Sequence, residues 1–299
     1  MPASSIRSRH LGKGEGMNIL VTGGTGVIGR YVIQDLVRAG HEVTNLGRSA
    51  GGDLSCRHLR ADLTNAGNVY EALAMSRAEA VVHMGAWANW GIVPHTRTYG
   101  DNVTGTFNLF QACADLGVRR VVSASSAQVY GFEKFPPLYV PVDEAHPLRP
   151  LNSYALAKIA NERAAEYFVA NYGLTILSFR IMATRAPAKI ASEVAHLSKH
   201  PETGTFLLWT RGDARDCARA CRLAIEKEEV ASGVYNITGG VVLSETSEQL
   251  VRRYFGDQTE VRASLKDHES PLSCAKAEAA FGYRPTYLWS ETRTYPEEQ

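Results

Sequence analysis

The alternation of short apolar runs with longer helical segments, which begins at Met17, constrains the fold of this chain most strongly. Apolar runs bounded by turn residues are typical of strands that are buried on both faces of a parallel sheet. Five strands are predicted: Asn18–Val21, Glu42–Leu46, Ala80–Met84, Val121–Ser125 and Leu174–Phe179. Helices are predicted between them: Val27–Ala39, Val69–Ala74, Asn102–Leu116 and Ser153–Asn171. The pattern predicts an α/β fold with a doubly wound parallel sheet covered by helices.

The rhythm becomes less regular after Arg180. The elements expected there are strands near Phe206–Trp209 and at Gly233–Ile237, and helices near Ala214–Glu226 and Glu245–Tyr254. We therefore expect residues 17–180 to form the main domain, and residues 181–299 to form a small substrate-binding lobe interleaved with the sheet. Residues 1–16 are small, polar and basic, and are expected to be a disordered tail.

Charge and composition narrow the classes of function. The chain has 32 Lys and Arg against 31 Asp and Glu, with no long run of one sign, so we expect a small-molecule substrate rather than nucleic acid or membrane. No stretch approaches the roughly 20 apolar residues of a membrane span, and a signal-peptide core is missing, which favours a cytoplasmic location. The five cysteines show no metal-ligand spacing, so no metal site is expected, and Cys217 and Cys221 are interpreted as packing residues.

A Gly-rich turn follows the first predicted strand and opens the first predicted helix. Its glycines are Gly23, Gly26 and Gly29, with Val27 and Ile28 between the last two. The first glycine permits a tight turn, the second lets the backbone approach a pyrophosphate, and the third allows close packing of helix and sheet. A helix N-terminus also favours phosphate groups. The turn therefore predicts a dinucleotide site in a Rossmann-like domain over residues 17–180.

The end of the second predicted strand indicates which dinucleotide binds. An NAD-selective site places an acidic side chain there, but this chain has Gly47 followed by Arg48. A guanidinium can bind a 2′-phosphate through two parallel hydrogen bonds, so Arg48, alone or with Arg30, predicts NADP in preference to NAD. The alternative is that Arg48 is a solvated loop residue. Asp62 and Leu63, between the predicted strands Glu42–Leu46 and Ala80–Met84, are expected to hold the adenine edge, although Asp is also a common turn residue.

Tyr154 and Lys158 are four residues apart at the start of a predicted helix, so both project from one face. An ammonium near a phenol stabilises the phenolate, and the pair suits acid/base chemistry. The same spacing also arises by chance as a surface pair. The preceding strand ends in a hydroxyl cluster that includes Ser125 and Ser126, at the sheet edge where ligands of such folds bind. Ser126 is expected to hold the reacting oxygen.

In this order and spacing, the motifs resemble the extended short-chain dehydrogenase/reductase family, also called the NAD-dependent epimerase/dehydratase family, over roughly residues 17–287. The resemblance implies that Tyr154 is the acid/base, that Lys158 lowers its pKa and binds the nicotinamide ribose, and that Ser126 hydrogen-bonds the substrate oxygen. It also implies that Asn102 supports the site. A homodimer is expected by the same resemblance, joined through the helices near Asn102–Leu116 and Ser153–Asn171.

Two departures from the family pattern bear on the substrate. The segment after Arg180 lacks the Asn-Val-Tyr-Gly-Pro-like signature of sugar-nucleotide epimerases, and Trp209 stands where the family often has a diphosphate-binding Arg. The compact lobe looks more like family members that act on a free sugar acid or another small carbonyl compound, such as uronate dehydrogenases. Arg180 is then expected to bind a substrate carboxylate, or alternatively to pair with an internal acid such as Asp216. Arg185 or Arg211 is a second candidate for binding an anion.

The loop after the predicted strand Ala80–Met84 contains Trp87, Trp90 and His95, which are expected either to line the pocket or to pack against the neighbouring helix. His83, at the end of that strand, is interpreted as a packed histidine rather than a catalyst.

The main prediction is an NAD(P)-dependent oxidoreductase that transfers hydride to or from a sugar-like or other small hydroxyl or carbonyl substrate, with Tyr154 as acid/base. The first alternative is a nucleotide-sugar 4-epimerase that retains its NAD. The second alternative is a non-catalytic NADP-binding regulator on the same fold, although the presence of Tyr154, Lys158 and Ser126 favours an enzyme.

Overall fold

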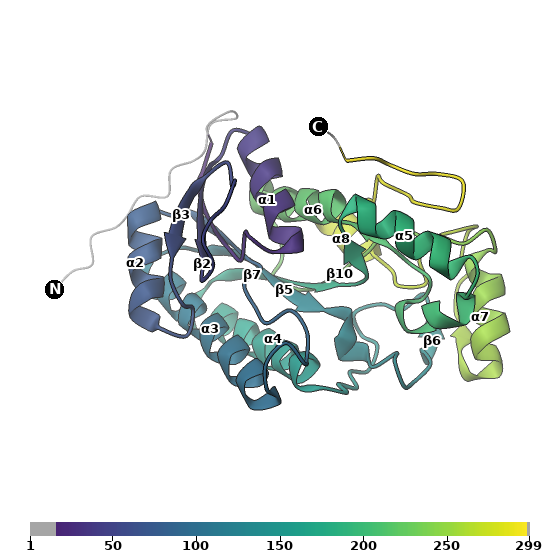
Figure 1. The fold of residues 1–299 in the computed structure, drawn as a ribbon. Coiled ribbons are helices and arrows are strands. Elements are labelled where there is room, and N and C mark those ends of the chain that lie inside the picture. The colour runs from purple at the N-terminus through teal and green to yellow at the C-terminus, as the bar shows by residue number, and fades with distance from the viewer. Residues whose placement is uncertain (1–15, 298–299) are drawn as a thin grey trace.

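A seven-stranded parallel sheet forms the centre of the molecule, with the strand order β10-β7-β5-β4-β1-β2-β3 (Figure 1). The structure is a computed structural model that describes residues 16–297, so the predicted tail lies, except for Gly16, outside the described residues. The sheet strands are β1 (Asn18–Thr22), β2 (Glu42–Gly47), β3 (Arg57–Arg60), β4 (Ala80–His83), β5 (Arg120–Ser126), β7 (Thr175–Ile181) and β10 (Gly233–Ile237). All five strands predicted between Asn18 and Phe179 are present in this sheet, which confirms the predicted fold class.

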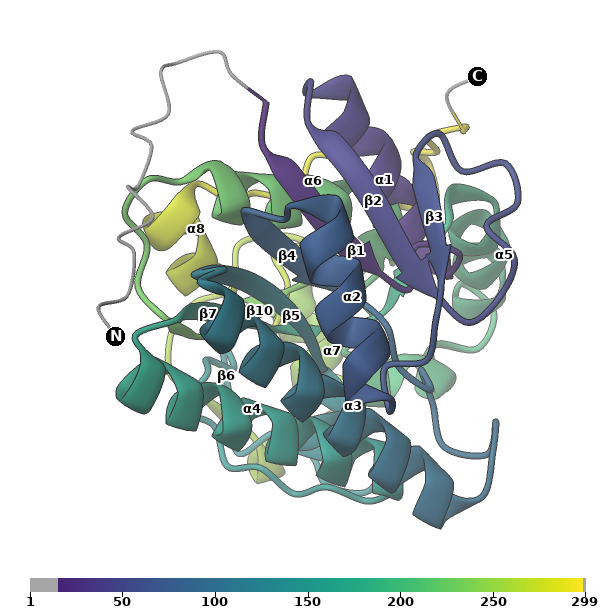
Figure 2. The same cartoon turned by 90° about the vertical axis from the view of Figure 1, so that its left-hand side faces the viewer.

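Helices cover both faces of the sheet. They are α1 (Val27–Arg38), α2 (Ala66–Ser76), α3 (His95–Leu116), α4 (Ser153–Tyr172), α5 (Pro187–Leu197), α6 (Ala214–Glu226), α7 (Ser247–Phe255) and α8 (Ala275–Phe281). Side chains of a strand alternate between the two faces of the sheet, so neighbouring residues such as Val81 and Val82 belong to different hydrophobic cores. One core contains α1, α6 and α8, and the other contains α2, α3 and α4 (Figure 2).

The C-terminal residues return to the sheet and also share a separate core with residues between positions 127 and 142. β10 is an edge strand beside β7, and α6 packs on the same face as α1. A third core surrounds the fully buried Trp209 and lies under α5 and α7, at the end of the molecule away from α2 (Figure 1). One short strand pair, β6 (Tyr139–Val140) with β11 (Glu260–Val261), joins the C-terminal residues to the preceding part of the chain. A second pair, β8 (Thr184–Arg185) with β9 (Gly212–Asp213), lies within the C-terminal residues.

One predicted element is wrong. The segment Phe206–Trp209 is not a strand but the end of a 3-10 helix over Pro201–Leu207, followed by Leu208 and Trp209 with φ angles of 50° and 55°. The Trp209 indole donates a hydrogen bond to the Pro201 carbonyl (2.7 Å) and packs between Tyr254 and Phe255. The apolar residues of Phe206–Trp209 therefore reflect burial of the indole and not a strand. Within residues 16–297, no helix combines the length and apolar character needed to span a bilayer.

Candidate active site

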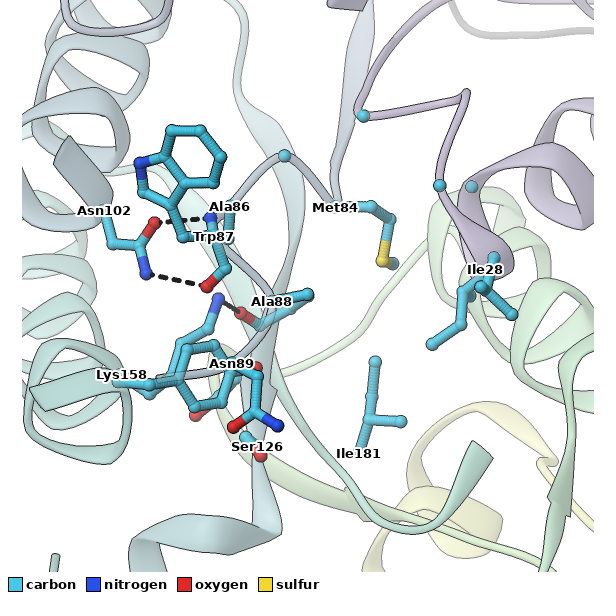
Figure 3. A pocket seen from close by; sticks show the side chains of 18 of the residues that line it. Ile28, Met84, Ala86, Trp87, Ala88, Asn89, Asn102, Ser126, Lys158 and Ile181 are labelled. Atoms are coloured by element: carbon cyan, nitrogen blue, oxygen red, sulfur yellow. Dashed lines mark hydrogen bonds between the residues drawn. The ribbon is translucent and has the colours of Figure 1, made fainter. Parts of the chain in front are cut away.

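A cavity of about 840 Å³ opens at the carboxyl ends of β1, β4, β5 and β7. The Gly-rich turn lines one end, Tyr154, Lys158 and Ser126 line the opposite end, and Arg185 lies on the wall supplied by the C-terminal residues. Lys158 and Ser126 lie on one side of the cavity, across from Ile28 (Figure 3). The strand order therefore brings together residues from distant parts of the sequence, at the edge where open α/β sheets bind ligands.

The Gly-rich turn is shaped for close approach of a ligand to backbone. Gly23 has a φ angle of +72°, and a Cβ atom on Gly29 would lie 2.2 Å from the Gly23 carbonyl oxygen, so both positions need glycine. No side chain caps α1 at Gly26, and Gly23, Gly26, Val27, Ile28 and Gly29 all line the cavity. An uncapped helix start beside an open cavity fits the pyrophosphate of a dinucleotide.

Arg48, Asp62 and Leu63 line the same end of the cavity. The Arg48 guanidinium stacks on the Trp87 indole, 3.7 Å from the ring centroid. Burial acts to raise the pKa of Asp62, but hydrogen bonds from Thr64 and the charges of Arg48 and Arg97 outweigh it and lower the pKa. Asp62 is therefore a carboxylate with two guanidinium groups nearby. Arg97, from the first turn of α3, was not expected there, because only the fold brings that turn close to β3.

Tyr154, Lys158 and Ser126 meet where α4 packs against the end of β5. Asn152 caps α4 by accepting a hydrogen bond from the Ala155 amide (2.9 Å), so the helix starts immediately before Tyr154. The Tyr154 side chain is hydrogen-bonded to Ser126, and Lys158 Nζ donates to the Ala124 carbonyl (2.6 Å). Lys158 Nζ lies 5.5 Å from the centre of the Tyr154 ring. The fold thus assembles the three residues that the sequence singled out.

The protonation equilibria of this pair are set mainly by burial. Burial raises the pKa of Tyr154 to about 12, against a smaller lowering by the Ser126 hydrogen bond. Burial also lowers the pKa of Lys158 to about 8, while the Glu162 carboxylate acts to raise it. The expected lowering of the Tyr154 pKa by Lys158 is therefore not achieved by the protein groups alone, because desolvation of the phenolate dominates.

The loop between β4 and α3 is held to α3 by side-chain hydrogen bonds. The Asn102 side chain accepts a hydrogen bond from the Trp87 amide (2.8 Å) and donates one to its carbonyl (3.1 Å), as Figure 3 shows. Trp87 lines the cavity, and its indole nitrogen donates to Asp101 (2.7 Å). Trp90 is half exposed and stacks on His95, which is hydrogen-bonded to Ser153 (2.9 Å).

His83 is a packed residue, as interpreted from the sequence. It is buried between the hydroxyl groups of Thr22 (2.7 Å) and Thr106 (3.0 Å). Burial, with a smaller contribution from the Lys158 charge, lowers the pKa of His83 to about 3, so the ring is neutral at physiological pH.

The structure corrects the expectation that Arg180 binds substrate. Its side chain is 5% exposed and forms a two-bond ion pair with Glu162, with Nε–Oε1 and Nη2–Oε2 distances of 3.0 and 2.7 Å. Its Nη1 donates to the Tyr130 hydroxyl (3.1 Å) and to the Glu144 carbonyl (2.9 Å). The internal acid is Glu162 rather than Asp216, whose carboxylate accepts hydrogen bonds from the backbone amides of Thr286 and Tyr287.

Arg185 lies on the cavity wall, whereas Arg211 is buried behind it. Both guanidinium groups bind Glu193, at 3.0 Å from Arg185 and 2.5 Å from Arg211. Sequence reasoning missed Glu193 and Glu162. The signal for Glu162 was its position four residues after Lys158 on the same helix face.

Comparisons with known proteins agree with this geometry. UDP-glucose 4-epimerase of Lactobacillus helveticus is 32% identical over 157 residues, which make up 49% of this chain and 46% of that protein. UDP-glucose 4-epimerase of Streptomyces lividans is 34% identical over 167 residues, 53% of this chain and 50% of that protein. The chain spans about half the length of the curated relatives it matches.

Two solved structures share the fold at low sequence identity. A short-chain dehydrogenase/reductase superfamily protein of Agrobacterium tumefaciens with bound NAD has a TM-score of 0.69 at 22% identity, covering 90% of this chain and 93% of that one. UDP-glucose 4-epimerase of Thermotoga maritima with UDP-glucose also has a TM-score of 0.69 at 22% identity, covering 90% and 94%. The model of the NAD dependent epimerase/dehydratase family matches residues 19–238, and the chain therefore belongs to this family.

Proposed function

We propose that this protein catalyses NAD(P)-dependent hydride transfer at a secondary alcohol or carbonyl carbon of a small, sugar-like substrate. One observation carries the proposal: Tyr154, Ser126 and Lys158 line the same cavity as the Gly-rich turn. A dinucleotide on that turn and a substrate beside Tyr154 would therefore share one enclosed space.

The protein residues supply the proton transfer and the orientation of the substrate. In the oxidative direction the Tyr154 phenolate takes the hydroxyl proton, and in the reductive direction the phenol returns it to the oxygen. Ser126 holds the same oxygen by a hydrogen bond, and the Lys158 ammonium stabilises the phenolate. Bound NAD(P) accepts or donates the hydride in this chemistry.

Replacing Tyr154 by Phe tests the proposal. The variant removes the exchangeable proton but keeps the ring, so hydride transfer should be lost while dinucleotide binding persists. Binding is measured by fluorescence titration and turnover by nicotinamide absorbance. Full turnover in the Phe variant would overturn the assignment.

We also propose that NADP is preferred over NAD. Support comes from the Arg48 guanidinium at the cavity end opposite the C-terminal wall, and from the absence of an acidic residue at the end of β2. Arg48→Ala should lower kcat/KM for NADP and leave that for NAD almost unchanged. An unchanged ratio between the two dinucleotides would refute the role of Arg48.

A small substrate is favoured over a nucleotide sugar by the cavity wall after residue 180. Among the described residues on that wall, Arg185 is the single cation, and it is already paired with Glu193. Trp209 is fully buried, so it offers no contact to a diphosphate. A panel of sugar acids, aldoses and UDP-sugars, assayed with NAD and NADP, identifies the substrate class.

The second candidate function is a nucleotide-sugar 4-epimerase, favoured by the identity of 32% and 34% with UDP-glucose 4-epimerases. Retention of cofactor separates the two candidates. An epimerase should purify with tightly bound NAD and cause no net change in nicotinamide absorbance, whereas a dehydrogenase should consume added dinucleotide in proportion to product.

A homodimer through α3 and α4 is part of the proposal. Phe107 on α3 and Leu156 and Tyr167 on α4 are 44%, 49% and 47% exposed, which leaves apolar surface on this helix pair. Light scattering of the purified protein tests it, with Phe107→Glu expected to give a monomer.

A further inference from the structure

Tyr154, Lys158 and Glu162 follow one another at intervals of four residues along α4, and all three side chains are buried. Each meets one of three successive residues of β5: Lys158 the Ala124 carbonyl, Glu162 the Ser125 hydroxyl, and Tyr154 the Ser126 hydroxyl. Helix and strand are thus joined by three consecutive polar contacts. Two of the three have a role in the proposed reaction, whereas the contact of Glu162 has none so far.

We propose that Glu162 is a positioning residue for the catalytic pair, acting on Lys158 from the next helical turn while Arg180 and Ser125 hold its carboxylate in place. This inference rests on the proposed function. The carboxylate accepts three hydrogen bonds: one from Ser125 (2.6 Å) and two from Arg180 (3.0 and 2.7 Å). Arg180 is in turn fixed by Tyr130 and the Glu144 carbonyl. The three hydrogen bonds therefore fix the orientation of the carboxylate, one helical turn along α4 from Lys158.

The charged groups around Lys158 explain why an anion is needed there. Tyr154 and Glu162 act on it from α4 and His83 acts on it from β4, whereas Arg180 from β7 pairs with Glu162 and contacts Tyr130 from the 3-10 turn after β5. The histidine is neutral, both phenols have pKa values raised to about 12 by burial, and Arg180 carries a positive charge. Glu162 thus supplies the negative charge that favours the ammonium form of Lys158.

Loss of this charge should lower the pKa of Lys158, which burial already brings to about 8. At neutral pH a larger fraction of the lysine would then be uncharged, so it would stabilise the Tyr154 phenolate less. A purely structural Glu162 would affect stability but would leave the titration of Lys158 unchanged.

The experiment follows Lys158 itself by NMR in protein labelled with ¹⁵N-lysine and without dinucleotide, with Lys158→Met assigning the signal. Glu162→Gln should lower the Lys158 pKa by at least about one pH unit. Glu162→Asp keeps the charge on a shorter side chain and should give a smaller shift in the same direction. If the Gln variant does not fold, Glu162→Asp alone is the test. An unchanged Lys158 pKa in Glu162→Asp would then overturn the proposal.

Tyr130→Phe is the matched control, because it removes a hydrogen bond from Arg180 and leaves the charge of Glu162 in place. Its Lys158 pKa should stay at the wild-type value. An equal shift in Tyr130→Phe and Glu162→Gln would mean general loosening of the network and would overturn the proposal, as would an unshifted Gln variant.

Steady-state kinetics separates this inference from the proposed function. In an active enzyme the alkaline limb of kcat/KM should move to lower pH in Glu162→Gln by the amount seen in the NMR titration. A wild-type protein without hydride transfer, but with the titration shift, would refute the function and retain the positioning role. An active wild-type enzyme in which Glu162→Gln leaves the Lys158 pKa unchanged would retain the proposed function and refute the positioning role.

Discussion

The two ends of the cavity are lined by different kinds of chemical group. The Gly-rich end is backbone and glycine, where an added methyl group at Gly29 would lie 2.2 Å from a carbonyl oxygen. The catalytic region depends instead on buried ionised side chains, chiefly the pair of Glu162 and Arg180 next to Lys158. The first end should thus be sensitive to side-chain volume and the second to charge.

The largest effect is expected at the reacting oxygen itself. Tyr154→Phe should lower kcat/KM by at least about 10²- to 10⁴-fold, because the proton transfer in the transition state is lost. Tyr167→Phe, on the exposed face of the same helix, is the control and should have wild-type activity. A loss of dinucleotide affinity in Tyr154→Phe would contradict the separation of dinucleotide binding and proton transfer between the two ends of the cavity.

The sensitivity of the second end to charge is tested by comparing two acidic residues one turn apart on α4. Glu162→Ala leaves the Arg180 charge buried without its partner and should lower the free energy of unfolding by about 3–5 kcal/mol. Glu166 forms an ion pair with Arg163 in which both side chains are at least 60% exposed. Glu166→Ala should therefore cost less than about 1 kcal/mol in urea unfolding. Similar losses in both variants would contradict this account.

Volume sensitivity is tested by two glycine-to-alanine changes. Gly29→Ala forces the Gly-rich turn apart and should cost about 1–3 kcal/mol, with weaker dinucleotide binding. Gly100 lies within α3, with no atom within 4 Å of an added Cβ. Gly100→Ala should stabilise the protein by about 0.5–1 kcal/mol, because alanine favours helix. Thermal unfolding measures the stability of both variants, and dinucleotide titration measures their affinity. Unaltered dinucleotide binding in Gly29→Ala would contradict the predicted sensitivity of this end to side-chain volume.

The smallest effect concerns His83, between the two ends. Its folded-state pKa of about 3 lies below the ordinary 6.5, so the unfolded chain binds a proton that the folded protein does not. The His83 contribution to stability is therefore present above pH 6.5 and is lost as the pH falls toward 3. Between pH 6.5 and 5.5 the loss should be about 1 kcal/mol. This part of the pH dependence should be absent in His83→Gln, as measured by urea unfolding.

Local patterns were enough to predict the glycine-built end of the site and much of the sheet. Helix α6 and strand β10 coincide with the predicted segments Ala214–Glu226 and Gly233–Ile237. Apolar periodicity and turn residues determine such elements through contacts near in sequence. Tyr154, Lys158 and Ser126 were found for the same reason, because each belongs to a short motif next to an element boundary.

The ionic contacts were not predicted, because their partners lie on different elements and only the tertiary fold brings them together. For Arg180 the sequence left open a substrate carboxylate or an internal acid such as Asp216, and its partner Glu162 lies on another element, 18 residues away. The segment around Trp209 was predicted as a strand because burial of its indole by Tyr254 and Phe255 depends on the tertiary fold. Helices α5 and α8 were missed in the region where the alternation of strands and helices is weakest.

The division of the cavity wall has a consequence for how this protein can acquire new specificity. β7 ends at Ile181, whose register partner on β5 is Ser126, and the wall residues between Met182 and Leu207 belong to a segment that contains none of the three residues proposed for proton transfer. Insertions or exchanges in that segment can reshape the space around a substrate while the reaction machinery stays intact. Engineering of a different substrate range should therefore begin there.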